Sequence, residues 1–147
     1  MTPPTLTQSN VLHLLVPHPA PDQTTARTLL IALRRIAAGG IDDASATNLL
    51  IGAFGMGYRR PLMFLRVLMQ ELSRVSQRQI AIAPCCCPRM TEGEAAILLA
   101  IDSGSAHPEV ARAALSRVTG TLDLAPALSV AQALASSMED LGRPISL

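Results

Sequence analysis

Three consecutive cysteines are the residues of this chain whose side chains are best suited to chemistry. Thiolates bind soft metal ions and are readily oxidised, so the triplet could be a metal site completed by a histidine, or a redox-sensitive thiol group. Zinc sites usually place paired cysteines two to four residues apart and repeat the pair elsewhere, and this sequence has no second cluster. The candidate metal ligands are Cys85, Cys86, Cys87 and His13, with His18 as the alternative histidine.

Prolines on both sides make the triplet a stiff connector. Pro84 and Pro88 lack backbone donors, and each favours extended geometry in the residue before it. Neighbouring side chains of an extended segment point in opposite directions, which is unfavourable for joint coordination of one ion. Cysteine is also among the residues most often buried. We therefore predict that the three cysteines pack beneath the core, with thiol oxidation and metal binding as alternatives; no cofactor is expected.

No catalytic constellation is recognisable in the sequence. His107 and Glu109 flank the start of an expected helix, where capping and solvation are their usual roles, and no nucleophile is placed beside them by the sequence. His18 lies between prolines. Phosphate-binding loops, dinucleotide fingerprints and paired-histidine helix motifs are absent from the sequence. We predict that the protein is not an enzyme.

Arginine supplies all twelve basic residues, and their distribution is uneven. Residues 56–89 hold six Arg and one Glu, a net charge of +5, whereas residues 90–147 hold three Arg and seven acids, a net charge of −4. A basic face of this kind could bind nucleic acid or an acidic protein, because neutralised phosphates release counterions. The acidic half could equally complement it within the chain or across a dimer, which we favour. The candidate partner-binding residues are Arg59, Arg60, Arg66, Arg74 and Arg78.

Six helices are predicted from caps and apolar periodicity. Asp22 is expected to cap the first helix, and Asp42 or Asp43 the second. The other four are expected to start at Pro61, Glu92, Pro108, and Leu124 or Ala125. The expected ends of the six helices are near Ala38, Phe54, Gln77, Asp102, Val118 and Leu141.

Two of these helices carry stronger predictions. On the first, Arg27 and Arg34 fall on the face opposite the apolar stripe and are expected to be exposed. The fourth begins with the spacing of a capping box, Thr91 to Glu94, and two acids in its first turn suit the positive end of the helix dipole. Its apolar residues occupy every side, so we expect it at the centre of the fold.

The first 21 residues are predicted to form a proline-rich arm, and residues 22–147 a single helical domain. The alternation of Ile80 and Ile82 favours a short strand over residues 79–83, whose obvious partner would be the apolar run 11–16. The sequence does not decide whether these two segments pair.

Composition supports a soluble helical protein. The 147 residues suit one domain, and the 2% of aromatic residues and the absence of Trp favour closely packed helices over a sandwich. Apolar runs of the about 20 residues that a membrane span needs are absent from the sequence. The N-terminus has no basic residue before Arg27, unlike a signal peptide, so the expected location is the cytoplasm, with reduced thiols.

Residues 87–99 read Cys-Pro-Arg-Met-Thr-Glu-Gly-Glu-Ala-Ala-Ile-Leu-Leu, a turn containing cysteine and proline followed by a capped, Leu-rich helix. The segment resembles a pattern of small uncharacterised helical proteins from alphaproteobacteria. The resemblance implies a bacterial helical domain and no particular activity.

The sequence as a whole predicts a mainly α protein, a compact bundle of five to six helices, and leaves open whether one short two-stranded β pair is added to it. The first functional hypothesis is a non-enzymatic interaction or regulatory domain that self-associates as a homodimer through apolar helix faces. The second is a regulator that binds nucleic acid through the Arg-rich face. The third is a thiol- or metal-dependent sensor at the triple cysteine.

Overall fold

The computed structural model describes residues 15–147, and in this part of the chain it is a bundle of six α-helices with one two-stranded pair. The predicted fold class is confirmed. The helices are α2 (Thr24–Gly39), α3 (Ala44–Phe54), α4 (Arg59–Val75), α5 (Glu92–Ser103), α6 (Pro108–Thr119) and α7 (Ala125–Asp140). The short elements are the 3-10 turn η1 (Gly55–Gly57) and the strands β1 (His18–Pro19) and β2 (Arg89–Met90).

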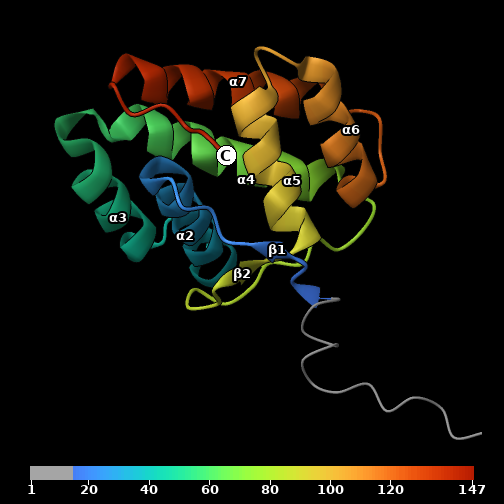
Figure 1. Ribbon diagram of the computed structural model, residues 1–147, viewed down its shortest axis with the longest axis horizontal. Helices are drawn as coiled ribbons and strands as arrows, with labels where there is room; N and C mark the ends of the chain where they lie inside the picture. The colour runs from blue at the N-terminus through green and yellow to red at the C-terminus, as the bar shows by residue number, and fades with distance from the viewer. Residues whose placement is uncertain (1–14) are drawn as a thin grey trace, which may run out of the picture.

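Helices α4 and α7 lie side by side, and α5 crosses in front of α4 (Figure 1). Helix α6 packs against α5 at one end of the molecule, and α2 and α3 pack together at the other. The β1–β2 pair lies at the edge of the bundle, below α2 and α5 in this view. Among the described residues, every helix is too short or too polar to cross a lipid bilayer.

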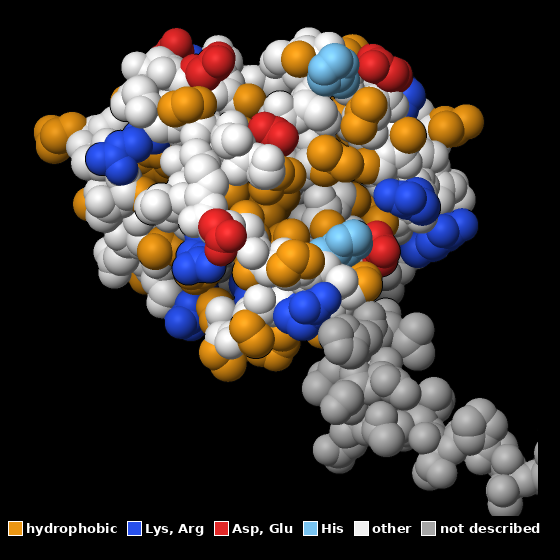
Figure 2. All heavy atoms as spheres, in the orientation of Figure 1, with side chains coloured by type: hydrophobic (Ala, Val, Ile, Leu, Met, Phe, Trp, Pro, Cys, Tyr) orange, Lys and Arg blue, Asp and Glu red, His pale blue; other side chains and the backbone are white. Residues whose placement is uncertain are grey.

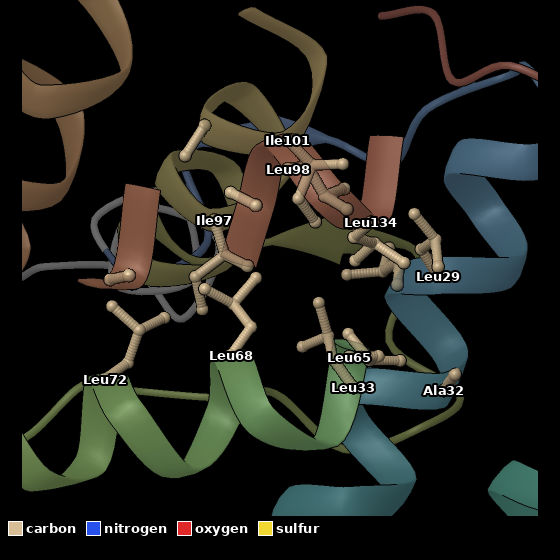
Figure 3. Packing of buried hydrophobic residues seen from close by; sticks show 14 of the residues in the cluster. Leu29, Ala32, Leu33, Leu65, Leu68, Leu72, Ile97, Leu98, Ile101 and Leu134 are labelled. Carbon is tan, nitrogen blue, oxygen red and sulfur yellow. The ribbon is translucent and has the colours of Figure 1, made fainter. Parts of the chain in front are cut away.

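The core forms where α4, α5, α7 and α2 meet (Figure 3). Leucines of α4 point toward Ile97 of α5, and Leu134 of α7 and Leu29 of α2 lie on one side of this contact. Helix α5 is central, as its all-round apolar sequence predicts, and eight of its twelve residues are buried. The residues that Figure 3 labels are Leu29, Ala32, Leu33, Leu65, Leu68, Leu72, Ile97, Leu98, Ile101 and Leu134.

Most predicted helix caps are confirmed. Asp43 accepts a hydrogen bond from the Ala46 amide at 2.9 Å, and Thr91 and Glu94 form a complete capping box. The predicted cap of α2 is wrong, because Gln23 rather than Asp22 accepts from the first turn. The longer Gln23 side chain also donates to the Pro144 carbonyl at 2.7 Å, which ties the start of α2 to the C-terminal tail.

The predicted strand over residues 79–83 is wrong, because these residues form no strand. The antiparallel pair instead joins His18 to Met90 and Pro19 to Arg89. Side chains replace a strand partner along 79–83: the Thr91 hydroxyl donates to the Ala81 carbonyl at 2.7 Å. Of the run 11–16, residues 11–14 lie outside the described part of the chain, and neither Leu15 nor Val16 is in a strand.

Replacement of Leu68, which is fully buried, tests the packing of the core. Leu68→Ala should lower the free energy of unfolding by about 3 kcal/mol, since it removes buried methyl groups and leaves a cavity. Urea denaturation measures the change. The control is Leu122→Ala, because Leu122 is 75% exposed and its truncation should cost less than about 0.5 kcal/mol. Equal losses for the two variants would contradict the packing described above.

Candidate functional site

A buried ion pair between Arg34 of α2 and Glu94 of α5 lies beneath the cysteine triplet. Their side chains are 2% and 0% exposed. Arg34 Nε donates to Glu94 Oε2 at 2.5 Å, and Arg34 Nη2 donates to Glu94 Oε1 at 3.1 Å. The prediction that Arg34 lies on an exposed helix face is therefore wrong, while Arg27 is exposed. The charge of Arg34 can be buried because a carboxylate from a distant helix pairs with it.

The guanidinium also binds the backbone around the cysteines. Arg34 Nη1 donates to the Cys87 carbonyl at 2.8 Å, and Nη2 donates to the Arg89 carbonyl at 2.7 Å. The planar fork of arginine suits such a set of acceptors in different directions. One side chain of α2 thus fixes the position of a loop more than fifty residues later in the chain.

The carboxylate of Glu94 serves three partners at once. Besides Arg34, it accepts from the Thr91 amide at 2.9 Å, which completes the capping box, and from the Ala83 amide at 3.3 Å. The segment before the cysteines and the start of α5 are therefore bound to the same buried group.

The pKa of Arg34 reflects this environment. Burial acts to lower the pKa, but the hydrogen bond and the charge of Glu94 raise it, and the nearby Cys87 and Cys85 thiolates would add to the rise. The net result is a pKa above the ordinary value. Arg34 is consequently a permanent cation.

The cysteines occupy a tight turn in which the Cys87 amide donates to the Pro84 carbonyl at 3.1 Å. All three thiols are free. Cys86 is exposed, whereas Cys85 and Cys87 are half-buried. The prediction that all three pack beneath the core is therefore wrong, because the turn places its middle cysteine in solvent.

The described residues around the cysteines do not form a metal site. Within residues 15–147, no group of three or more His, Cys, Asp and Glu side chains is placed to hold a metal ion. His13 lies outside these residues, so a site that includes it stays a prediction. His18 lies beside Glu92 instead, with Nε2 to Oε1 at 3.2 Å.

Arg89 binds the polypeptide that precedes β1. Its Nε donates to the Val16 carbonyl at 2.9 Å, and its Nη2 donates to the Pro17 carbonyl at 2.7 Å. The Ala20 amide donates to the Pro88 carbonyl at 3.2 Å. Residues 16–20 are therefore attached to the loop that Arg34 holds.

Residues 76–83, which follow α4, are here called the connecting segment. Several of them line an open groove. Its volume is about 960 Å³. The connecting segment lies close against α5, where a Cβ on Gly93 would come within 2.5 Å of the Ile80 side chain. The groove is bordered by Glu71, Arg74 and Arg78. Its apolar lining includes Ile36, Ile41, Val67, Ile80, Ile82 and Ile97.

The five candidate arginines extend along the whole length of α4 and beyond it. From Arg59 to residue 74 the helix rises about 22 Å. Arg60 lies 3.7 Å from the Asp140 carboxylate, an exposed pair that joins the basic segment to the acidic half of the same chain. Arg78 donates to the Arg117 carbonyl at 2.9 Å. The Arg60–Asp140 pair is thus an ion pair within the chain between its basic segment and its acidic half.

Arg66 and Arg74, further along α4, also have partners in the chain. Arg66 donates to the Thr47 hydroxyl of α3 at 3.1 Å. Arg74 binds Glu71 through Nε at 3.0 Å and Nη2 at 2.6 Å, and the hydrogen bond to Arg74 holds the pKa of Glu71 below its ordinary value. These contacts leave binding of an acidic protein or nucleic acid as a prediction.

Figure 2 shows how charge is distributed over one face of the molecule. Acidic and basic side chains are interspersed on it, and hydrophobic side chains gather at its lower edge, where the loop before β2 lies. This face has no extended patch of side chains that all carry the same charge.

A protein-family model described as a family of unknown function (DUF6628) matches residues 7–143. The chain belongs to this family. The DUF6628 match includes α2 and α5, so both members of the buried ion pair lie within it. Comparisons with curated proteins and with solved structures gave no match. The resemblance of residues 87–99 to alphaproteobacterial proteins stays a prediction.

Sequence reasoning missed Arg34 and Glu94, although a signal for each is present. Arg34 follows Leu30 by four residues, which places it on the edge of the apolar stripe of α2. Glu94 precedes seven consecutive apolar residues. An arginine and an acid that both adjoin apolar helix faces are candidates for a buried pair, although a single sequence does not show that they meet.

Removal of the carboxylate charge tests the pair. Glu94→Gln keeps the shape of the side chain but leaves the Arg34 cation buried without a counter-charge, so the free energy of unfolding should fall by about 3–5 kcal/mol. Urea denaturation measures the fall. Glu92→Gln is the matched control, because Glu92 begins the same helix and its side chain is 57% exposed. A loss for Glu94→Gln no larger than that for Glu92→Gln would contradict the proposed role of the pair.

Proposed function

We propose that this domain is a non-enzymatic interaction module that self-associates as a homodimer through the hairpin of α3, η1 and α4. The observation that carries the proposal is an apolar surface on this hairpin that continues into the groove. Exposed apolar patches on soluble proteins commonly mark interaction sites.

Large hydrophobic side chains are exposed along the hairpin. Ile51 is 41% exposed, Met63 is 49% exposed and Val67 is 40% exposed. Met56, in η1 at the tip of the hairpin, is 98% exposed. The other exposed large hydrophobics among the described residues are distributed over separate elements, at Leu15, Val110, Leu122, Leu141 and Leu147.

The positions of these residues on α3 and α4 place Ile51 and Met63 toward the η1 end of the hairpin. The Arg66–Thr47 hydrogen bond fixes the level at which α3 and α4 meet. Ile51 lies one turn after Thr47 on α3, and Met63 lies one turn before Arg66 on α4. Both are therefore nearer than this hydrogen bond to the tip of the hairpin. Val67 is four residues after Met63 on the same face of α4 and also lines the groove.

Charge complementarity favours a second copy as the partner. Arg59 and Arg60 at the start of α4 lie beside the acidic end of α7, where Arg60 already pairs with Asp140. A surface with both signs next to an apolar patch is self-complementary about a twofold axis, because each copy offers to its partner what it accepts. Met side chains at the tip of the hairpin adapt to such a contact, since they are flexible and polarisable.

A charge placed in the apolar surface tests self-association. Val67→Asp buries a carboxylate in the proposed interface, so it should weaken dimerisation at least about tenfold, the equivalent of about 1.4 kcal/mol. Size-exclusion chromatography with light scattering over a concentration series measures the mass, and the wild type should have twice the mass of the chain.

The matched control is Val110→Asp on α6, because Val110 is 42% exposed, close to the 40% of Val67. This variant should remain dimeric. Circular dichroism confirms that both variants are folded. A wild-type chain that stays monomeric at the highest concentrations would contradict the proposal, as would equal effects of the two substitutions.

A further inference from the structure

A tight turn, closed by the Cys87 amide and the Pro84 carbonyl at 3.1 Å, bends the chain between Cys85 and Cys87. Disulfide-bonded residues have Cα atoms about 4.4–6.8 Å apart. Adjacent residues are fixed at about 3.8 Å, which is too short for an unstrained bond. Residues two apart reach at most about 7 Å when extended, and the turn closed by the Cys87 amide and the Pro84 carbonyl brings Cys85 and Cys87 closer than this.

Solvent exposure separates the same two cysteines from the third. Cys85 and Cys87 are half-buried, and Cys86 between them is exposed. The first and third thiols therefore lie on the inner side of the turn, and the second lies on the outer side.

The buried ion pair keeps the turn in this form. Arg34 Nη1 holds the Cys87 carbonyl at 2.8 Å, and Glu94 holds the Ala83 amide just before the turn at 3.3 Å. Pro84 and Pro88 restrict the backbone on both sides. Because these contacts use backbone groups, both inner thiols remain free to react.

We infer that Cys85 and Cys87 form a thiol-oxidation site, a dithiol that closes to an intrachain disulfide by exchange with a small-molecule disulfide such as oxidised glutathione. One inner thiolate attacks a sulfur of oxidised glutathione, which forms a mixed disulfide and releases one glutathione thiolate. The other inner thiolate attacks the protein sulfur of that mixed disulfide, which forms the Cys85–Cys87 bond and releases the second glutathione thiolate.

The reaction balances without a further reactant. The two cysteine thiols lose two protons and two electrons, and one oxidised glutathione becomes two reduced glutathione molecules. Cys86 remains a thiol, because a bond from it to either neighbour would join adjacent residues. The site is independent of the proposed dimerisation, since the cysteines lie outside the α3–α4 hairpin.

The experiment treats the folded, fully reduced chain with excess oxidised glutathione, blocks remaining thiols with N-ethylmaleimide at low pH, and analyses the product by mass spectrometry. Trypsin releases residues 79–89 as one peptide that holds all three cysteines. The expected peptide carries one N-ethylmaleimide, on Cys86, and is lighter by two hydrogen atoms at the other two cysteines. The number of free thiols falls from three to one.

Serine variants identify the bonded pair. Cys86→Ser should still form the bond and lose its last free thiol, while Cys85→Ser and Cys87→Ser should each form none and accumulate glutathione adducts instead. Because Cys86→Ser changes only the exposed position, it serves as the matched control for a serine in the turn.

Other results would overturn the inference. They are three free thiols after treatment, stable glutathione adducts on the wild-type turn, a bond that includes Cys86, or loss of the bond in Cys86→Ser. Thermal melts of each variant establish that the chain under test is folded, and a variant that is unfolded is replaced by the corresponding alanine substitution.

Discussion

The rest of the structure depends on the buried charge pair of Arg34 and Glu94. An arginine buried to 2% exposure is stable only with a counter-charge and with acceptors for its other donors, and Glu94 together with the carbonyls of Cys87 and Arg89 supplies both. The pair joins α2 to α5. It also fixes the loop between α4 and α5, which forms neither helix nor strand before β2.

Several features of the site follow from this constraint. The Glu94 carboxylate binds the end of the connecting segment, so the wall of the groove and the cysteine turn share one anchor. Arg89, which follows the turn, binds residues 16 and 17 and so attaches the N-terminal part of the described chain to the same loop. In this DUF6628 protein, a groove, a thiol turn and the N-terminal segment are thus connected through a single buried pair.

The elements of the bundle were predictable because local signals determine them. Asp43, the capping box at Thr91 and the glycine at position 120 fix helix ends through bonds or backbone angles within a few residues. The all-round apolar sequence of α5 placed it at the centre of the fold. These signals act over one or two turns of helix, so one sequence suffices to find them.

Apart from the cap of α2, the features that sequence reasoning missed depend on contacts beyond a single helix turn. The partner of Arg34 is sixty positions away, and residues 79–83 lack a strand partner because Thr91 and Glu94 bind their backbone instead. Exposure of Cys86 depends on the turn that the pair holds in place. A periodic pattern shows which face of a helix is apolar. It does not show which charged residue at the edge of that face will be paired with an opposite charge on another helix.

Native-state hydrogen exchange, followed by NMR, tests most directly whether the pair ties the loop to the bundle. The amides of Ala83 and Thr91 donate to the Glu94 carboxylate and lie outside any helix ladder. If the pair joins the loop to the core, both amides should exchange with the same free energy of opening as the buried amides of α5, such as that of Leu98. Exchange of the two amides at the rate of an unprotected loop, while Leu98 stays protected, would contradict the account.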